Sequence, residues 1–290
     1  MRSEEQMLEV ILSIARDDER IRAVILNGSR VDPNAPRDFF QDFDVIFLVT
    51  EFEPFVNNLE WIKRFGELMI LQLPDLMNDP PPGSKISFAY LMQFTDGNRI
   101  DLSIYPLAHL SMLKSDSLSQ VLLDKDRILP ELPPANDSDY LPQPPTLKQF
   151  ADCCNEFWWV CPYVAKGLWR NEITYANGML EQALRIELMK MITWYVGVNT
   201  SYSKNPGKLG KYLDRYLEPE LWKMLVDTYA DADYTYTWQA LFIMSDLFRI
   251  VARKVGEHFD YDYPASDDSR VSAHLRHIKS LSRNAREMYE

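Results

Sequence analysis

The sequence predicts an α+β protein, in which a mixed five-stranded sheet flanked by helices is followed by an all-helical bundle. Up to about residue 145, short apolar runs of strand length are interspersed with helical segments, and beyond it apolar residues recur at steps of three and four. A stretch with six prolines between residues 129 and 146 separates the two patterns. We therefore expect two domains, 1–145 and 146–290.

The first element is an amphipathic helix over about residues 3–17. Ser3 and Gln6 have the spacing of a capping box, and apolar residues follow at helical spacing. The next two elements, 21–26 and 43–49, are short apolar runs, as expected of strands that are buried on both faces. These two runs should form the centre of the sheet.

Three more strands complete the predicted sheet. A helical stretch around 54–65 leads to an apolar run at 68–71, and two further β-like runs follow at 86–94 and 99–105. The last two are joined by Asp96-Gly97-Asn98, which is typical of a hairpin turn. The first domain therefore has five predicted strands.

The second domain is predicted to consist of helices alone. Apolar residues recur at three- and four-residue steps over 150–160, about 171–198, 218–229 and 236–256. The sequence has no internal repeat and no low-complexity tract. Four helices of this kind would bury their apolar faces against one another in a bundle.

The charge of the chain restricts its partners. A formal net charge of −12 argues against a general attraction to DNA, RNA or an anionic membrane, and it favours a cationic small molecule. Solubility alone also explains such acidity. The sequence leaves open whether the protein is a monomer or a homodimer.

Cysteine usage and the lack of membrane signals indicate a cytoplasmic protein. Cys153 and Cys154 are adjacent, which is poor disulfide geometry, and Cys161 leaves an odd number. The N-terminus lacks a signal-peptide core, and no apolar run approaches the roughly 18 residues of a membrane span. We therefore expect a reducing compartment.

Three acids occupy strand positions that predict a metal site. Asp42 and Asp44 are two residues apart on one expected strand, so both side chains point to the same face. Asp101 lies 57 residues after Asp44, on a strand that we expect beside it. Burying unpaired carboxylates would cost several kcal/mol per ion, so the acids need either a shared divalent cation or a solvent-facing strand edge. Asp101 could be a metal ligand, a general base or both.

A glycine-serine turn precedes these acids. Gly28-Ser29 ends the strand 21–26, and a glycine lets the backbone approach a ligand closely and present N–H groups to phosphate oxygens. Ser29 adds a hydroxyl and Arg30 a positive charge. Alone, such a pair is ordinary turn chemistry; followed by the acids, it predicts a phosphate-binding turn beside a metal site.

Together these motifs resemble the nucleotidyltransferase superfamily, and within it the aminoglycoside 6-adenylyltransferases, which modify streptomycin. The resemblance spans nearly the whole chain. It rests on LNGSR (26–30), FQDFDVIFLV (40–49), DGNRIDLSIYP (96–106), LLDKD (122–126), ADCCNEFWW (151–159), KGLWRNEI (166–173) and GKLGKYLDRYL (207–217).

The resemblance implies an N-terminal nucleotidyltransferase catalytic domain and a C-terminal helical domain that binds the acceptor. It implies transfer of an adenylyl group from ATP, bound with Mg²⁺, to a hydroxyl of an aminoglycoside, with streptomycin first among the acceptors. Pyrophosphate is released, and the product is an inactivated antibiotic. Asp42, Asp44 and Asp101 would then be the catalytic and metal-binding residues.

Two departures from the family pattern leave the acceptor open. Asn27 stands where family members commonly have a glutamate, and Gly178-Met179 stand where they commonly have Asp-His. Another aminoglycoside, another hydroxylated small molecule or a protein side chain are therefore alternatives, as is a nucleotide-binding sensor or toxin partner without transfer activity. Glu172 and Glu181 are candidates to bind a cationic acceptor, with a solvated helix face as the alternative.

Three further residues of the second domain are candidates for substrate binding. Lys208 and Lys211 could reach the triphosphate oxygens, as cations do in phosphoryl transfer, although exposed lysines at a helix start are also common. Trp169 could stack on a ring of the acceptor, although aromatic residues at helical spacing more often belong to a core.

Overall fold

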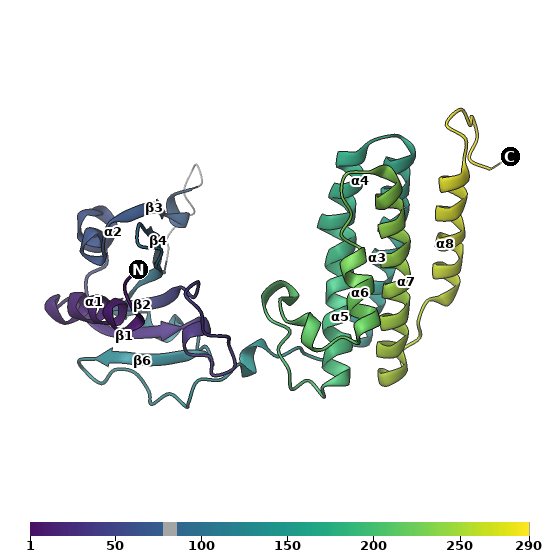
Figure 1. The fold of residues 1–290 in the computed structure, drawn as a ribbon. Helices are drawn as coiled ribbons and strands as arrows, with labels where there is room; N and C mark the ends of the chain where they lie inside the picture. Colours follow the sequence, from purple (N-terminus) through teal and green to yellow (C-terminus); the bar gives the residue numbers. More distant parts are fainter. Residues whose placement is uncertain (78–85, 290) are drawn as a thin grey trace. The chain divides into compact units, whose positions relative to one another are not determined.

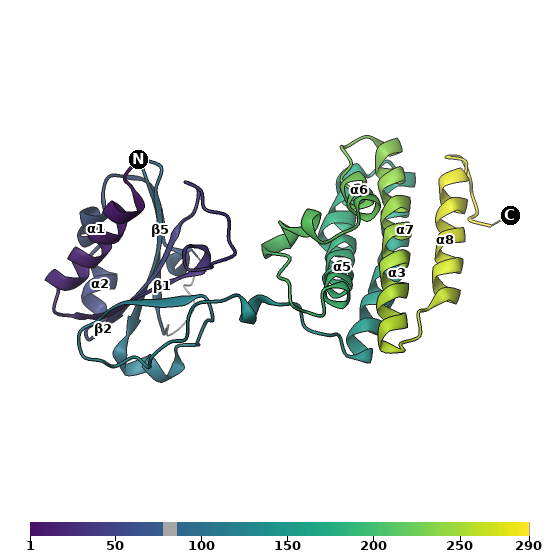
Figure 2. The same ribbon diagram turned by 60° about the horizontal axis from the view of Figure 1, so that its bottom comes forward.

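The computed structural model describes residues 1–77 and 86–289, and it divides into two units, Met1–Asp139 and Tyr140–Glu290. The first unit contains a sheet with flanking helices, and the second contains helices. Figures 1 and 2 show these elements from two directions. The α+β class predicted from the sequence is confirmed.

The sheet of the first unit has six strands in the order β3-β4-β5-β2-β1-β6. The central neighbours β2 and β5 run parallel, and the other neighbouring strands are antiparallel, so the sheet is mixed as predicted. The strands are β1 (Ile21–Asn27), β2 (Phe43–Val49), β3 (Leu68–Gln72), β4 (Phe88–Phe94), β5 (Arg99–Pro106) and β6 (Ser119–Asp124).

The prediction of five strands was wrong, because β6 was missed. This strand pairs with β1 at the edge of the sheet, and most of its side chains are only partly buried. Its apolar part is the three residues 121–123, between Ser119-Gln120 and Asp124. An edge strand needs neither a long apolar run nor a clean alternation, so the sequence carries little signal for it.

The two faces of the sheet are covered by different elements. On one face, α1 (Glu4–Asp17) and α2 (Glu53–Asn57) pack with the 3₁₀-helical segment Glu60–Phe65 in the main core. Figure 2 shows α1 and α2 on the same side of the strands. The predicted capping box of α1 is present, with Ser3 accepting from the N–H of Gln6. On the other face, a small cluster around Leu48 packs against residues 107–113 and 128–129.

The second unit is a bundle of helices around one core (Figure 1). Its longest helix begins after Thr146, whose hydroxyl accepts from the N–H of Gln149 in a capping box. All three cysteines are buried and free. The helices are α3 (Leu147–Trp169), α4 (Ile173–Met179), α5 (Arg185–Asn199), α6 (Pro219–Asp227), α7 (Tyr234–Phe259) and α8 (Ala265–Ser280).

Two features of the bundle differ from the prediction. The long helix expected over about 171–198 is divided into α4 and α5 by a π-helical turn, Leu180–Leu184. Helix α8 was not predicted, because it has few apolar residues and is joined to α7 by an ion pair between Asp268 and Arg249. Among the described residues, no helix is long and apolar enough to cross a membrane.

Candidate active site

The three predicted acids come together at the centre of the sheet. Because β2 and β5 are parallel neighbours, Asp44 lies directly opposite Asp101, and Asp42 precedes the first residue of β2. One carboxylate oxygen from each of the three lies within 4.8 Å of the other two. All three residues are partly buried. Oxygen donors at this spacing suit a divalent cation such as Mg²⁺.

The electrostatics of this cluster are those of a site short of positive charge. Burial raises the pKa of Asp44 to about 7, and the charges of Asp42 and Asp101 add to the increase. Arg99 acts in the opposite direction but does not cancel it. A divalent cation would provide the missing charge, because it favours the ionised form of each carboxylate.

Gly28 makes room for the central carboxylate. It begins a 3₁₀-helical turn, Gly28–Arg30, directly after β1, and its φ is +76°. A Cβ atom at this position would lie 2.2 Å from Oδ2 of Asp44. The N–H of Gly28 donates to the carbonyl of Leu118 at 3.0 Å, rather than facing a ligand as the sequence suggested. Glycine is therefore required here because of the acid beside it.

Arg30 holds the backbone that leads into the acid cluster. Its Nε donates to the carbonyl of Asp42 at 2.9 Å, and its Nη2 donates to the carbonyl of Gln41 at 2.5 Å. Nη1 faces Glu4 at 3.1 Å, and the guanidinium carbon lies 3.6 Å from the ring centre of Phe43. All three guanidinium nitrogens thus face protein groups, so in this structure Arg30 positions Asp42 rather than offering its charge to a phosphate.

Gln41 completes a reciprocal contact between the turn and the strand. Its amide nitrogen donates to the carbonyl of Ser29 at 3.0 Å and to the hydroxyl of Ser29 at 3.3 Å. The ends of the loop over residues 31–40 are therefore tied to each other. This arrangement holds the Ser29 hydroxyl in the turn that begins at Gly28. Sequence analysis missed Gln41, because glutamine has no characteristic spacing.

Arg99 is a second residue of the site that sequence analysis missed. Its Nε and Nη2 each donate to one oxygen of Asp101 at 2.7 Å, and Nε lies 3.9 Å from Oδ2 of Asp42. A signal was present, because Arg99 is two residues before Asp101 and period-2 geometry places both on one face of β5. The fork-shaped guanidinium matches the two oxygens of a carboxylate.

Comparison with known proteins identifies the family. A family model described as streptomycin adenylyltransferase matches residues 1–278. The chain belongs to this family. An aminoglycoside 6-adenylyltransferase of Bacillus subtilis (strain 168) is 40% identical over 270 residues, which are 92% of this chain and 95% of that protein. One from Campylobacter jejuni is 41% identical over 280 residues, 96% of this chain and 97% of that protein.

A solved structure extends the comparison. The crystal structure of an aminoglycoside 6-adenyltransferase from Bacillus subtilis is 35% identical, with a TM-score of 0.48, and the match covers 97% of this chain and 100% of that one. The resemblance inferred from the motifs is confirmed by the family model and the relatives. As a member of the streptomycin adenylyltransferase family, the chain is an adenylyltransferase.

The two lysines predicted to contact the triphosphate belong to the second unit of this adenylyltransferase. Lys208 lies in the 3₁₀-helical turn Lys208–Gly210, and Lys211 follows it directly. Both side chains are exposed, and the Lys211 ammonium lies 4.9 Å from the ring centre of Tyr212. The acids belong to the first unit, so a role for these lysines at the phosphates stays a prediction.

The predicted acceptor residues have different surroundings. Arg185 donates to both oxygens of Glu181, at 2.5 and 2.7 Å, so the charge of this acid is already compensated. Glu172 is exposed at the start of α4. The indole N–H of Trp169 donates to the carbonyl of Leu281 at 3.2 Å. Of the two acids, Glu172 is thus the one more open to a cation.

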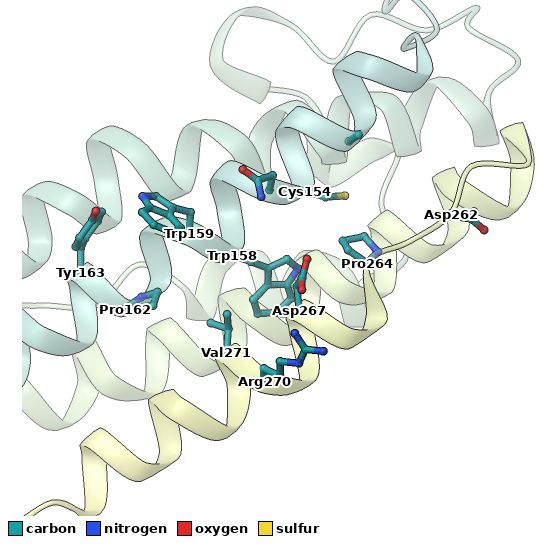
Figure 3. A pocket seen from close by; sticks show the side chains of 12 residues that line it. Cys154, Trp158, Trp159, Pro162, Tyr163, Asp262, Pro264, Asp267, Arg270 and Val271 are labelled. Carbon is teal, nitrogen blue, oxygen red and sulfur yellow. The ribbon is translucent and has the colours of Figure 1, made fainter. Parts of the chain in front are cut away.

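A cavity on the second unit offers another place for a ligand (Figure 3). It lies between α3 and α8 and has a volume of about 750 Å³. The exposed fraction of Trp159 is 64%, and Figure 3 shows Tyr163 beside it on α3. Asp262 and Asp267 lie on the opposite wall, which Arg270 shares. Aromatic rings next to carboxylates are groups that bind cationic rings.

Proposed function

We propose that this enzyme transfers the adenylyl group of Mg²⁺-bound ATP to a hydroxyl of an aminoglycoside, releases pyrophosphate and so gives antibiotic resistance. The observation that supports this most strongly is the group of three carboxylates on, or directly before, the adjacent parallel strands β2 and β5, with oxygens within 4.8 Å of one another. The family and its relatives, which are named for streptomycin and aminoglycosides, support the choice of acceptor.

The residues present fit a divalent cation. Asp42 and Asp44 would hold it, and Mg²⁺ bound there would neutralise phosphate charge and make the α-phosphorus more electrophilic. The raised pKa of Asp44 supports this assignment, because it shows a carboxylate whose charge lacks compensation within the protein. The Ser29 hydroxyl, fixed by Gln41, would donate to a phosphate oxygen.

The transfer step needs one base. The acceptor hydroxyl oxygen forms a bond to the α-phosphorus, the bond from that phosphorus to the bridging oxygen breaks, and pyrophosphate leaves with the electron pair. The hydroxyl proton passes to a carboxylate, for which we propose Asp101. Asp101 lies opposite Asp44 on the neighbouring strand, so a hydroxyl held at the metal site would be within its reach.

The acceptor is proposed to bind on the helical unit. Streptomycin is the first candidate because the family model is named for it, and other aminoglycosides remain alternatives because Asn27 and Gly178 depart from the family pattern. Asn27 accepts a hydrogen bond from Ser119 at 3.2 Å, so it joins β1 to β6. The net charge of −12 favours a polycationic acceptor and argues against nucleic-acid partners. A cytoplasmic location is proposed from the three free cysteines.

The activity can be tested with purified protein. Pyrophosphate release from ATP and Mg²⁺ is measured with streptomycin, with a panel of other aminoglycosides and without acceptor, and the product is identified by its added adenylyl mass. We expect acceptor-dependent release that EDTA abolishes. A panel in which no aminoglycoside gains an adenylyl group would refute the proposed acceptor class.

The place of acceptor binding can be tested by comparing two substitutions. Trp159→Ala removes the exposed ring of the cavity, whereas Glu181→Gln removes the acid paired with Arg185. If the cavity binds the acceptor, Trp159→Ala should raise KM for the acceptor about tenfold, the effect of losing a stacking contact of about 1–1.5 kcal/mol. KM for ATP serves as the internal control. A rise only in Glu181→Gln would instead place the acceptor at the π-helical turn between α4 and α5.

A further inference from the structure

The acid cluster contains its own cation. The Nε and Nη2 atoms of Arg99 donate to the two oxygens of Asp101 at 2.7 Å, and Nε lies 3.9 Å from Oδ2 of Asp42. Arg99 therefore lies closer to Asp101 than to Asp42. The bidentate contact uses both carboxylate oxygens, which a metal ion would otherwise bind. Asp42 and Asp44 receive no comparable fork from any described residue. The three acids are thus unequal in this structure.

We propose that Arg99 is an internal counter-cation, which competes with divalent metal for Asp101 and is displaced when nucleotide binds. The inference rests on the proposed function in assigning Asp42 and Asp44 to Mg²⁺. Before nucleotide binds, the cluster holds one metal ion, on Asp42 and Asp44. After Arg99 has moved, Asp101 is free to bind a metal ion or to accept the proton of the acceptor.

The position of Arg99 allows this exchange. Its side chain is 44% exposed, so moving it costs little burial, in contrast to Arg30, whose side chain is 6% exposed. A triphosphate carries several anionic oxygens in the geometry that a guanidinium binds with two parallel hydrogen bonds. Its arrival beside the acids therefore offers Arg99 a second bidentate partner and releases Asp101. Arg99 would thus leave Asp101 free to bind metal or to accept a proton only when nucleotide is present.

The proposal is tested by metal binding without nucleotide or acceptor. Mn²⁺ replaces Mg²⁺, and free Mn²⁺ is measured by electron paramagnetic resonance during titration of the full chain. Arg99→Gln should bind Mn²⁺ about tenfold more tightly than the wild type, because both oxygens of Asp101 then become available to the ion, and should take up a second ion. Arg99→Lys keeps the charge but cannot form the fork, so its Mn²⁺ affinity should lie between those of the wild type and Arg99→Gln.

A matched control is available on the same sheet. Arg22 on β1 makes a similar fork with Asp126, at 2.6 and 2.5 Å, away from the acid cluster. Arg22→Gln should leave Mn²⁺ binding unchanged. An equal gain in Arg22→Gln would mean that only overall charge matters and would overturn the proposal. Thermal unfolding followed by circular dichroism checks that each variant is folded.

A double substitution tests whether the effect passes through Asp101. In protein that already carries Asp101→Asn, the further change Arg99→Gln should alter Mn²⁺ affinity by less than about twofold, because the acid for which Arg99 competes is gone. Unchanged or weaker Mn²⁺ binding in Arg99→Gln alone overturns the proposal. Failure of the proposed function is distinct, since it would show as a wild-type protein that makes no adenylylated product while its metal binding still depends on Arg99.

Discussion

Two groups of charged residues in this protein differ in how completely the acids are compensated. In the helical unit, Asp268 is buried, and Arg249 donates to both of its oxygens at 2.6 Å. Tyr263 and Ser272 donate to the same carboxylate at 2.9 and 3.0 Å. In the sheet unit, three carboxylates share one guanidinium, that of Arg99, and it forms a fork with only one of them.

The difference shows in the direction of the pKa shifts. Burial alone would raise the pKa of Asp268, but hydrogen bonds from Arg249 and Tyr263 outweigh it, so the pKa is lowered. At Asp44, burial and the neighbouring acids raise the pKa to about 7. An acid whose charge is compensated stabilises the fold. An uncompensated acid lowers the stability of the folded protein and is typical of a functional site.

The largest expected effect is that of Asp44→Asn, which should lower turnover by about 10³-fold or more because the central metal ligand is lost. The same change should raise the stability of the metal-free protein, since it removes a charge that repels two others. Turnover is measured by pyrophosphate release and stability by thermal unfolding with EDTA. Full activity in this variant would break the assignment of the acid cluster.

The opposite result is expected for Asp268→Asn. Removing one partner of a buried ion pair leaves Arg249 without its counter-charge and should cost about 3 kcal/mol of unfolding free energy. Urea denaturation measures the loss. Asp246→Asn is the control, because Asp246 is 60% exposed and pairs with the same arginine, and it should cost less than about 1 kcal/mol. Equal losses of unfolding free energy in the two variants would contradict the view that the buried pair with Asp268 stabilises the fold more than the exposed pair with Asp246.

A glycine comparison sharpens the link between the turn and the acids. Gly28→Ala would place a Cβ atom 2.2 Å from Oδ2 of Asp44 and strain a φ of +76°, so kcat should fall about 100-fold as the carboxylate is displaced. Gly178 on α4 is the control, since a Cβ there meets no atom within 4 Å. Gly178→Ala should stabilise the helix by about 0.5–1 kcal/mol and, because it displaces no side chain, should lower kcat far less than Gly28→Ala does. Steady-state kinetics measure kcat for both variants, and an equal kcat in the two would contradict the role of Gly28 beside Asp44.

The central part of the site could be predicted from the sequence because its signals are local. The runs that form β1 and β2 are continuous and apolar, as buried strands require, and the spacing of Asp42 and Asp44 is visible without knowing the fold. Pairing of β2 with β5 then brings Asp101 to the same place. Each step depends on residues close together in the chain, or on strands with a strong signal.

The parts that were missed depend on contacts between distant residues. The role of Arg30 follows from the closing of the loop 31–40. The fork of Arg99 with Asp101 lies within one strand, but its approach to Asp42 depends on the register between β2 and β5. Helix α8 packs Leu275 and Ile278 into the core of the bundle, and its Asp268 pairs with Arg249, 19 residues away in sequence. Neither residue type nor periodicity reveals such partners, because arginine and aspartate are also common on solvated surfaces.

The smallest expected effect is the pH dependence of stability, which should have opposite signs for Asp44 and Asp268. A raised pKa means that the folded protein holds the Asp44 proton where the unfolded chain, with a pKa of about 3.9, has released it. The stability contributed by protonated Asp44 is therefore present below about pH 4 and is lost as the pH rises through about 7. For Asp268 the sign is reversed, since a lowered pKa contributes stability above about pH 4 that is lost as the pH falls.

Urea denaturation of metal-free protein between pH 4.5 and 8 measures both contributions as differences from the Asn variants. The unfolding free energy of the wild type, less that of Asp44→Asn, should fall by about 1–2 kcal/mol over this range, since Asp44 is partly exposed and its shift is screened. The difference from Asp268→Asn should stay nearly constant there and shrink only below about pH 4. Adding Mg²⁺ should flatten the Asp44 curve, because the cation then replaces the proton as the compensating charge. Parallel curves for the wild type and Asp44→Asn would mean that Asp44 is not the uncompensated acid.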